Sequence, residues 1–233
     1  MLSGLRMDGA EAVGGMVVLK FGAMRLSFSD GVNLRLGRNG TKPPARHQLF
    51  LGFEDGDFLV CTVRMYGTLW AFEEGTNDHP YYLAAAEKPS PLSDAFNREY
   101  FDGLCRNAAR SLSVKDLLAT EQRIPGLGNG VLQDVLFRAR IHPRSRVEAL
   151  SGRQLDVLYA SVKDILAEMT AAGGRDTESM LLGEAGGYRT LLSKKTYDLP
   201  CPACGRQIVR QAYLGGNVYF CPFCQPVQLG RFD

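Results

Sequence analysis

The sequence lacks the features that mark membrane proteins, secreted proteins and histidine-based metal sites. No apolar run approaches the ~18 residues that a membrane-spanning helix needs. The opening residues, MLSGLRMDGAEAVGG, contain no apolar segment of signal-peptide type. The three histidines, His47, His79 and His142, form no His-x-x-His pair, so we interpret them as structural residues. We therefore predict a cytoplasmic protein with no membrane partner.

A large excess of either charge is also missing. The 233 residues carry a formal net charge of +2, which alone does not predict a nucleic-acid partner. Four arginines nevertheless fall within a short stretch that contains no acid, at Arg138, Arg140, Arg144 and Arg146. A solvated protein face is the commoner meaning of such a cluster. Close to a turn that can bind phosphate, the cluster favours a polyanionic partner.

The pattern of apolar residues predicts an α+β protein with distinct parts. Residues 1–73 contain short apolar runs separated by Asp-Gly turns, which is typical of an antiparallel β-sandwich. Residues 74–93 are rich in turn residues and are predicted to be a linker. The predicted strands of the sandwich are Met16–Phe21, Met24–Phe28, Val32–Leu36, Gln48–Phe53, Phe58–Met65 and Thr68–Phe72.

Residues 94–199 have helical periodicity. We predict one helix from about Asp94 to Arg110 and a long one from about Ser151 to Ala171, followed by a loop with a short helix over residues 173–199. Between the two helices, the pattern of residues 113–139 predicts a helical hairpin. Its first helix is expected to stop at Pro125 and Gly126.

The turn of this hairpin is Pro-Gly-Leu-Gly-Asn. Asn129 can cap the second helix, and Gly128 allows a close approach to the backbone. Free N–H groups at a helix N-terminus suit a phosphate group. An ordinary αα-hairpin with a glycine-rich corner is the alternative.

The last part, residues 200–233, contains four of the six cysteines. They form two Cys-x-x-Cys pairs separated by sixteen residues: Cys201 with Cys204, and Cys221 with Cys224. Two such turns can supply four thiolates to one tetrahedral zinc ion, whereas disulfides or a redox pair are the alternatives. We predict one structural Zn²⁺ held by a β-hairpin finger, with no open position for catalysis. Cys61 and Cys105 are expected to be buried thiols.

The order of these parts resembles the formamidopyrimidine-DNA glycosylase and endonuclease VIII family. The resemblance is carried by Glu121–Asn129 (EQRIPGLGN), by Leu136–Pro143 (LFRARIHP), by Gly173-Gly174 and by Tyr219–Gln225 (YFCPFCQ). It implies a helix–two-turns–helix element, a zinc finger that enters the minor groove, and a bifunctional DNA glycosylase/AP lyase that removes oxidised bases. Damaged or abasic double-stranded DNA is the implied partner, and we expect a monomer associated with a bacterial nucleoid.

The resemblance also implies the residues that contact DNA. Gly128 and Asn129 match the turn that holds DNA phosphates, and Arg64-Met-Tyr66-Gly67 is similar to an Arg-x-Phe-Gly loop. Arg64 would then reach the orphaned base and Tyr66 would enter the base stack. A groove-contacting arginine of the family falls at Gly216, and Asn217 lies beside it.

The sequence departs from the family pattern at the residues that carry out the reaction. The family nucleophile is an N-terminal proline followed by glutamate, whereas this sequence begins Met-Leu-Ser, and a family lysine falls at Met16. We therefore expect a missing N-terminal segment, no catalytic residue in the chain as written, and no lyase activity from it. A non-catalytic protein that binds damaged DNA is one alternative. A zinc-ribbon module that binds RNA or protein is the other.

Overall fold

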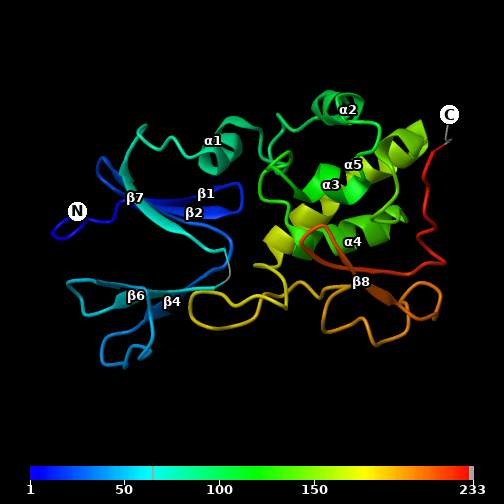
Figure 1. The fold of residues 1–233 in the computed structure, drawn as a ribbon. Coiled ribbons are helices and arrows are strands. Elements are labelled where there is room, and N and C mark those ends of the chain that lie inside the picture. The colour runs from blue at the N-terminus through cyan, green and yellow to red at the C-terminus, as the bar shows by residue number, and fades with distance from the viewer. Residues whose placement is uncertain (65, 231–233) are drawn as a thin grey trace.

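The computed structural model describes residues 1–64 and 66–230, which form two lobes joined by a narrow waist (Figure 1). One lobe consists of antiparallel strands. The other consists of helices, with a strand hairpin along its lower side. This arrangement confirms the predicted α+β class. Among the described residues, none of the helices is both long and apolar enough to cross a membrane.

The β lobe is a sandwich of two sheets. One sheet has the strand order β1-β2-β3-β7, and the other has the order β4-β6-β5. The strands are β1 (Gly9–Val13), β2 (Met16–Phe21), β3 (Met24–Phe28), β4 (Val32–Gly37), β5 (Leu49–Gly52), β6 (Phe58–Val63) and β7 (Leu69–Glu73). The predicted strands are confirmed to within two residues at each end. The exception is Met65, which lies outside the described residues.

The two sheets enclose an apolar core. Leu19 and Phe21 of β2 and Leu26 and Phe28 of β3 meet Leu59 and Cys61 of β6. Burial also raises the pKa of the Cys61 thiol, so that it stays protonated and behaves as a small apolar side chain. The predicted structural role of Cys61 is confirmed.

The predicted linker contains a helix that the turn-rich composition hid. Helix α1 (Pro80–Glu87) begins after His79, whose Nδ1 accepts a hydrogen bond from the backbone N–H of Tyr81 at 3.2 Å. Pro80 occupies the first helical position, where a missing N–H costs nothing. The predicted helix from Asp94 is shorter than expected. Helix α2 (Arg98–Arg106) begins only after its cap Asn97, whose side chain accepts from Tyr100 N at 2.9 Å.

The helical lobe is built around two helices, α4 (Asn129–Ala139) and α5 (Gly152–Ala171), which pack against each other. Shorter elements surround them: α3 (Val114–Ala119) and the 3₁₀ turn η1 (Val147–Ala149). Helix α5 matches its prediction, and Ser151 and Gln154 form a reciprocal capping box at its start. The short helix predicted within residues 173–199 is wrong, because this described segment contains only turns and isolated bridges.

The two lobes touch through glycine backbone. A Cβ on Gly126, in the turn before α4, would lie 2.8 Å from the carbonyl carbon of Gly14, in the turn between β1 and β2. A Cβ on Gly14 would lie 2.9 Å from the Cβ of Ala85 in α1. No side chain fits between these turns. The waist therefore depends on residues without a Cβ.

We predict that Gly126→Ala destabilises the protein more than Gly40→Ala does. Both glycines have a left-handed backbone, with φ +79° and +82°, so both variants incur a similar strain of about 1–2 kcal/mol. Only the Gly126 variant collides with the other lobe, which adds about 1–3 kcal/mol. Urea unfolding of the two variants measures the difference. Equal losses of unfolding free energy would mean that the waist tolerates a methyl group.

Candidate nucleic-acid interface

The connection between α3 and α4 is longer than the sequence predicted. Helix α3 ends at Ala119, well before Pro125, so the prediction that Pro125 and Gly126 stop it is wrong. The chain reverses at Glu121 and Gln122, which take left-handed φ values of 53° and 47°. The Gln122 Oε1 then accepts the Gly126 N–H at 3.2 Å. A second, glycine-based turn leads into α4, so the hairpin contains two turns rather than one.

The start of α4 presents backbone donors to solvent. Gly128 is the N-cap residue and provides no side-chain cap, and Asn129 is the first helical residue. The prediction that Asn129 caps the helix is therefore wrong, and its exposed side chain is left free for other contacts. No acceptor among the described residues receives the N–H groups of Gly128, Asn129 or Gly130. The predicted anion-binding character of this turn has a geometric basis.

A basic residue that the sequence analysis missed lies at the same helix end. A Cβ on Gly130 would fall 1.9 Å from Nη1 of Arg175, so the guanidinium group covers the first turn of α4. Arg175 is half-buried and pairs with Glu178. Its charge adds to the positive end of the helix dipole and strengthens an anion site there. The glycine at position 130 was the available signal, because it permits this close contact.

Two arginines of the cluster form ion pairs with acidic residues of the same chain. Arg138 makes a two-pronged ion pair with Glu168, with N–O distances of 2.6 and 2.8 Å. Arg146 lies 3.8 Å from a Glu148 oxygen. Arg144 is exposed, and its guanidinium lies 4.7 Å from the ring centre of Tyr213, at the tip of the finger. Only part of this cluster therefore faces the proposed polyanion side.

The four cysteines of the finger converge. All four Sγ atoms lie within 4.8 Å of one another, with Cys201 and Cys224 separated by 3.9 Å and Cys204 and Cys221 by 3.6 Å. A disulfide needs about 2.05 Å, so these cysteines are not paired in that way. Four thiolates at about 2.3 Å around a tetrahedral zinc ion lie about 3.8 Å apart. The donor set and its spacing therefore fit a structural zinc ion.

The thiols of this cluster differ in acidity. Hydrogen bonding from the backbone N–H of Arg206 lowers the pKa of Cys204 to about 7, whereas burial raises the pKa of Cys224 to about 12. A metal binds the thiolate form of cysteine, so zinc binding would require these thiols to lose their protons. The backbone of each knuckle is tight: Gly205 N donates to Cys201 O at 2.8 Å, and Gln225 N donates to Cys221 O at 2.9 Å.

Buried polar side chains attach the finger to the helical lobe. The finger strands are β8 (Val209–Tyr213) and β9 (Gly216–Phe220), as predicted. Gln133 of α4 donates from Nε2 to the carbonyl oxygens of Asn129 and Asn217, at 2.9 and 3.0 Å, and accepts from Tyr219 N at 3.0 Å. Gln133 therefore ties β9 to the first turn of α4.

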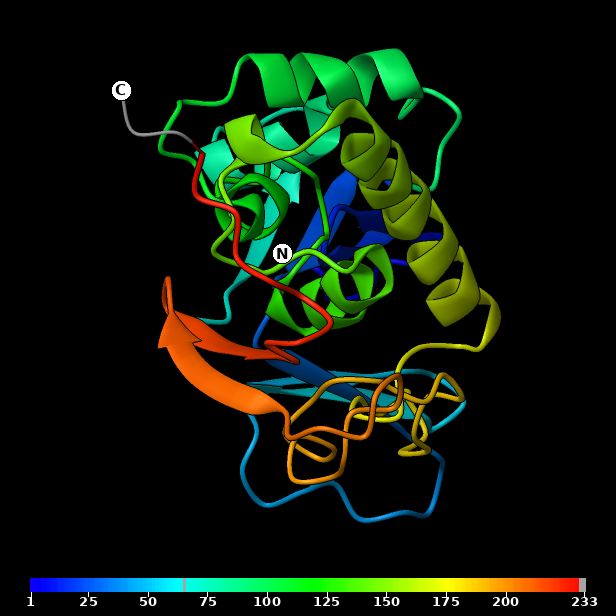
Figure 2. The ribbon, with the colours of Figure 1, turned by 90° about the vertical axis from the view of Figure 1, so that its right-hand side faces the viewer.

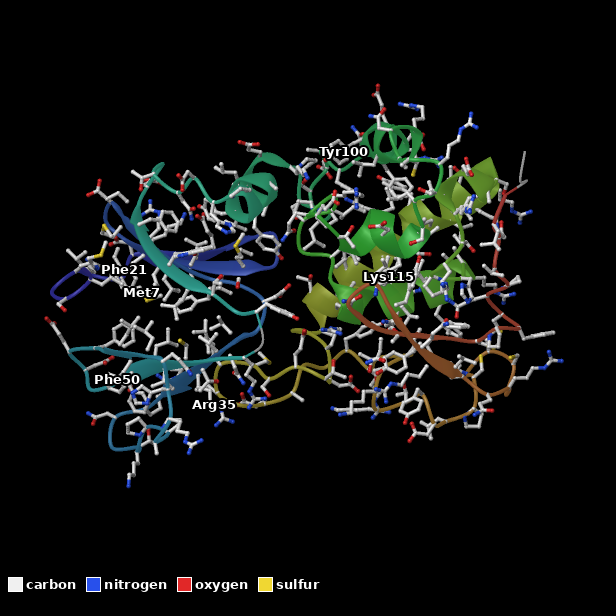
Figure 3. All side chains as sticks on the ribbon, in the orientation of Figure 1. Met7, Phe21, Arg35, Phe50, Tyr100 and Lys115 are labelled. Atoms are coloured by element: carbon white, nitrogen blue, oxygen red, sulfur yellow. The ribbon has the colours of Figure 1, made fainter. Side chains whose placement is uncertain are left out.

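Two further side chains extend this attachment. Lys115 of α3 is fully buried, and its Nζ donates to the carbonyl oxygens of Tyr213 and Leu214 in the finger turn. Figure 3 shows Lys115 where the finger passes the green helices. Gln225, also buried, donates to Ile141 O at 2.9 Å, just after α4. The sequence does not reveal the roles of Lys115, Gln133 and Gln225, because lysine and glutamine usually occupy surface positions.

The finger turn consequently lies beside the turn of the helical hairpin. A Cβ on Gly216 would be 2.9 Å from Nδ2 of Asn129. Figure 2 shows the orange and red finger passing beneath the green helices. Asn217 is half-buried and its Oδ1 accepts from Arg210 at 3.2 Å. A larger residue at 216 would displace Asn129, so the glycine keeps that side chain accessible.

The loop between β6 and β7 places Arg64 and Tyr66 at the surface of the β lobe. Arg64 N donates to Gly31 O at 2.8 Å, and a Cβ on Gly31 would approach Arg64 O to 2.5 Å. This contact fixes the loop on the turn between β3 and β4. The Tyr66 side chain is 88% exposed, far more than the edge of a core would allow. The loop thus presents its aromatic residue to solvent.

Several cavities lie along the waist and connect these features. A cavity of 160 Å³ is lined by Gly128 and Asn129 on one side and Asp30 on the other. A cavity of 630 Å³ is lined by Asp30, Arg64 and residues 177–181. Asp30 lines both cavities, so the Arg64 loop and the turn before α4 border neighbouring cavities of the waist.

The chain is similar to known proteins over nearly its whole length. Residues 88–180 match the family model described as the formamidopyrimidine-DNA glycosylase H2TH domain. A formamidopyrimidine-DNA glycosylase from Geotalea uraniireducens is 32% identical over 235 residues, covering 97% of this chain and 84% of the relative.

Solved structures agree with this similarity. The MutM (Fpg) protein of Thermus thermophilus has a TM-score of 0.82 and 28% identity, covering 96% of this chain and 84% of that one. A complex of the Lactococcus lactis Fpg with DNA that contains an abasic site has a TM-score of 0.81 and 26% identity, covering 96% and 83%.

We predict that Cys204→Ser removes zinc and unfolds the finger, whereas Cys105→Ser leaves zinc bound. Cys105 lies in α2, outside the cluster, and burial there raises its pKa to about 12. The finger core is small, so its folding depends on the thiolate–metal bonds. Zinc content and limited proteolysis of residues 200–230 provide the measurements. A fully protected finger without zinc would show that hydrogen bonds alone hold it.

Proposed function

Because the chain belongs to the formamidopyrimidine-DNA glycosylase family, we propose that it is a base-excision repair protein that binds duplex DNA at a damaged or abasic position. By family it is a DNA glycosylase and AP lyase. The observation that carries the proposal is that the turn before α4 and the Arg64 loop border neighbouring cavities of the waist, while the finger turn lies against Asn129. We propose that it acts as a monomer on one duplex, in the nucleoid of a bacterial cell.

In this proposal the turn before α4 holds a DNA phosphate. The free N–H groups of Gly128, Asn129 and Gly130 point out of a helix N-terminus that Arg175 makes more positive. The exposed Asn129 amide supplies one more donor. Contacts of this kind fix the position of a duplex without reading its sequence.

The zinc finger makes a second contact with the same DNA strand. Cys201, Cys204, Cys221 and Cys224 bind the ion, which supplies only structural stability because all four positions are filled. Lys115 and Gln133 fix the finger turn next to Asn129. We propose that Asn217 contacts the minor groove from this turn and that zinc removal weakens DNA binding.

The Arg64–Gly67 loop completes the proposed interface from the β lobe. Tyr66 is exposed enough to enter the base stack, where its ring would occupy the space left by an extrahelical nucleotide. Arg64 is exposed beside it and carries donors suited to an unpaired base. Residues 177–181 line the adjoining cavity, which is where we place the damaged base. Tyr188, in the same segment of the chain, does not line this cavity. It packs against the helical core beside Asp134.

We predict that Asn129→Ala weakens binding to an abasic duplex about 3- to 10-fold, to a similar extent for different flanking sequences, because one phosphate hydrogen bond is lost. Fluorescence anisotropy with labelled duplexes measures the affinity. Asn107→Ala, which removes an exposed amide at the end of α2, is the matched control and should bind as the parent does. Parent-like affinity of the Asn129 variant would exclude this side chain from the phosphate site.

The chemistry is tested separately from binding. The 233 residues contain no Pro-Glu pair, and Met16 stands where the family has lysine. We therefore predict that the chain as written binds an abasic duplex but yields no covalent adduct with borohydride. The same chain carrying an added family-type Pro-Glu segment at its start should form one. An adduct from the chain as written would locate an amine nucleophile within these residues.

A second candidate function is a non-catalytic protein that binds damaged DNA through the same interface. Binding without an adduct, even from the chain with the added Pro-Glu segment, would favour it. Equal affinity for abasic and undamaged duplexes would instead favour the zinc-ribbon alternative.

A further inference from the structure

A third cavity lies on the β lobe, next to the interface described above, and the proposed function assigns it no role. We call it the aromatic hollow. It has a volume of 320 Å³, within the range of about 300–1,000 Å³ that small-molecule sites occupy. It is lined by Ser29, Asp30, Tyr66, Thr68, Trp70, His79 and Tyr81. Aromatic rings thus form most of its wall, and one carboxylate belongs to its lining.

The rings come from three separate elements. Trp70 of β7 contacts the His79 ring that precedes α1, with ring centres 4.2 Å apart at an angle of 44°. Tyr81 belongs to the first turn of α1 and is 38% exposed. Tyr66 forms the rim on the β6–β7 loop. Flat π-surfaces that stay accessible to solvent are the usual means by which proteins hold unstacked nucleobases.

The polar groups that line the hollow differ in whether they already have a hydrogen-bond partner. The Ser29 and Thr68 hydroxyl groups bond each other at 2.9 Å. The carboxylate of Asp30 accepts no hydrogen bond from any residue that the structure describes, and solvent can still reach it. Desolvation by the surrounding walls, and then the nearby Glu178, raise the pKa of Asp30, so its charge gains from any donor that arrives. All of its acceptor positions are open to a ligand.

The hollow also adjoins the proposed DNA path. Asp30 and Tyr81 line both the hollow and the 160 Å³ cavity beneath Asn129. Tyr66, the proposed wedge, stands at its edge. A base that Tyr66 displaces from the stack would therefore have the hollow beside it, and residues 177–181 do not belong to the lining of this hollow.

We propose that the aromatic hollow is a second nucleobase site, which takes an unstacked base carrying an exocyclic amino group, with its face against Trp70 or Tyr81 and its amino group donating to Asp30. A carboxylate accepts well from an amine such as cytosine N4 and repels a carbonyl at the same position. This inference rests on the proposed function, because it needs a bound duplex to supply the base.

Photocrosslinking with a halogenated base tests this inference. A duplex carries one abasic site and 5-iodocytosine, either opposite that site or next to it in the same strand. Irradiation of the full chain with this duplex should crosslink Trp70 or Tyr81, identified by mass spectrometry. The duplex that gives the crosslink identifies the strand that supplies the base. A crosslink to Tyr66 alone, or none at either probe position, would overturn the proposal.

The role of Asp30 is tested with matched bases and variants. 5-Iodouracil differs from 5-iodocytosine by a carbonyl in place of the amino group, so its crosslink yield should be about fivefold lower. Asp30→Asn should abolish that preference. Asp94→Asn, which removes an exposed acid in the turn before α2, should keep it. A cytosine preference that survives in the Asp30 variant would exclude the carboxylate.

Two further measurements separate this inference from the proposed function. Trp70→Leu and Tyr81→Leu should each reduce crosslinking about fivefold or more, while anisotropy shows that the duplex stays bound. Using both variants guards against misfolding of one of them, which thermal unfolding reports. Normal binding with unchanged crosslinking in both would refute the hollow alone. Failure of the parent to bind an abasic duplex would refute the proposed function, and the hollow with it.

Discussion

The close backbone contact between Gly14 and Gly126 holds the β lobe against the helical hairpin. It brings a turn of the β lobe against the second turn of the helical hairpin with no side chain between them. The start of α4 is therefore held next to the β3–β4 turn, and the cavities of the waist are narrow. Because interiors are packed closely, even one methyl group here would force the backbone of the two turns apart. The relative position of Asn129 and Arg64 follows from this contact.

The finger is positioned by a different means. Its own core is small, and its four clustered cysteines fit a structural metal ion, which would hold the finger together without determining where it lies. That position comes from Lys115, Gln133 and Gln225, whose polar atoms are paired with backbone groups of the finger or of the residue after α4. Removing one partner from a buried pair leaves a polar group unsatisfied, at a cost of about 1–3 kcal/mol. A metal in the cysteine cluster would supply stability, whereas these three side chains supply orientation.

The sequence could predict what depends on local pattern. The strands followed from alternation and Asp-Gly turns, α5 followed from its 3.6-residue period, and the zinc cluster followed from two spaced cysteine pairs. The features that depend on contacts between residues far apart in the sequence could not be predicted. Helix α1 has a turn-like composition and begins with a histidine cap, and Asn129 became the first helical residue because Gly128 took the cap position. Gln133 and Arg175 look like surface residues until the finger and Gly130 are placed against them.

The charges of the waist divide the interface into two kinds of surface. Around the start of α4, free N–H groups and Arg175 create a positive potential that suits phosphate. Asp30 and the nearby Glu178 add negative charge on the β-lobe side, which Arg175 partly offsets and which disfavours a phosphate there. A bound strand can satisfy both surfaces only if its backbone follows the helical hairpin while a base, with its amine donors, turns toward the β lobe. This explains why the proposed DNA interface contains an acidic residue. Asp30 would repel the phosphate backbone of DNA and favour a base that carries an amino group.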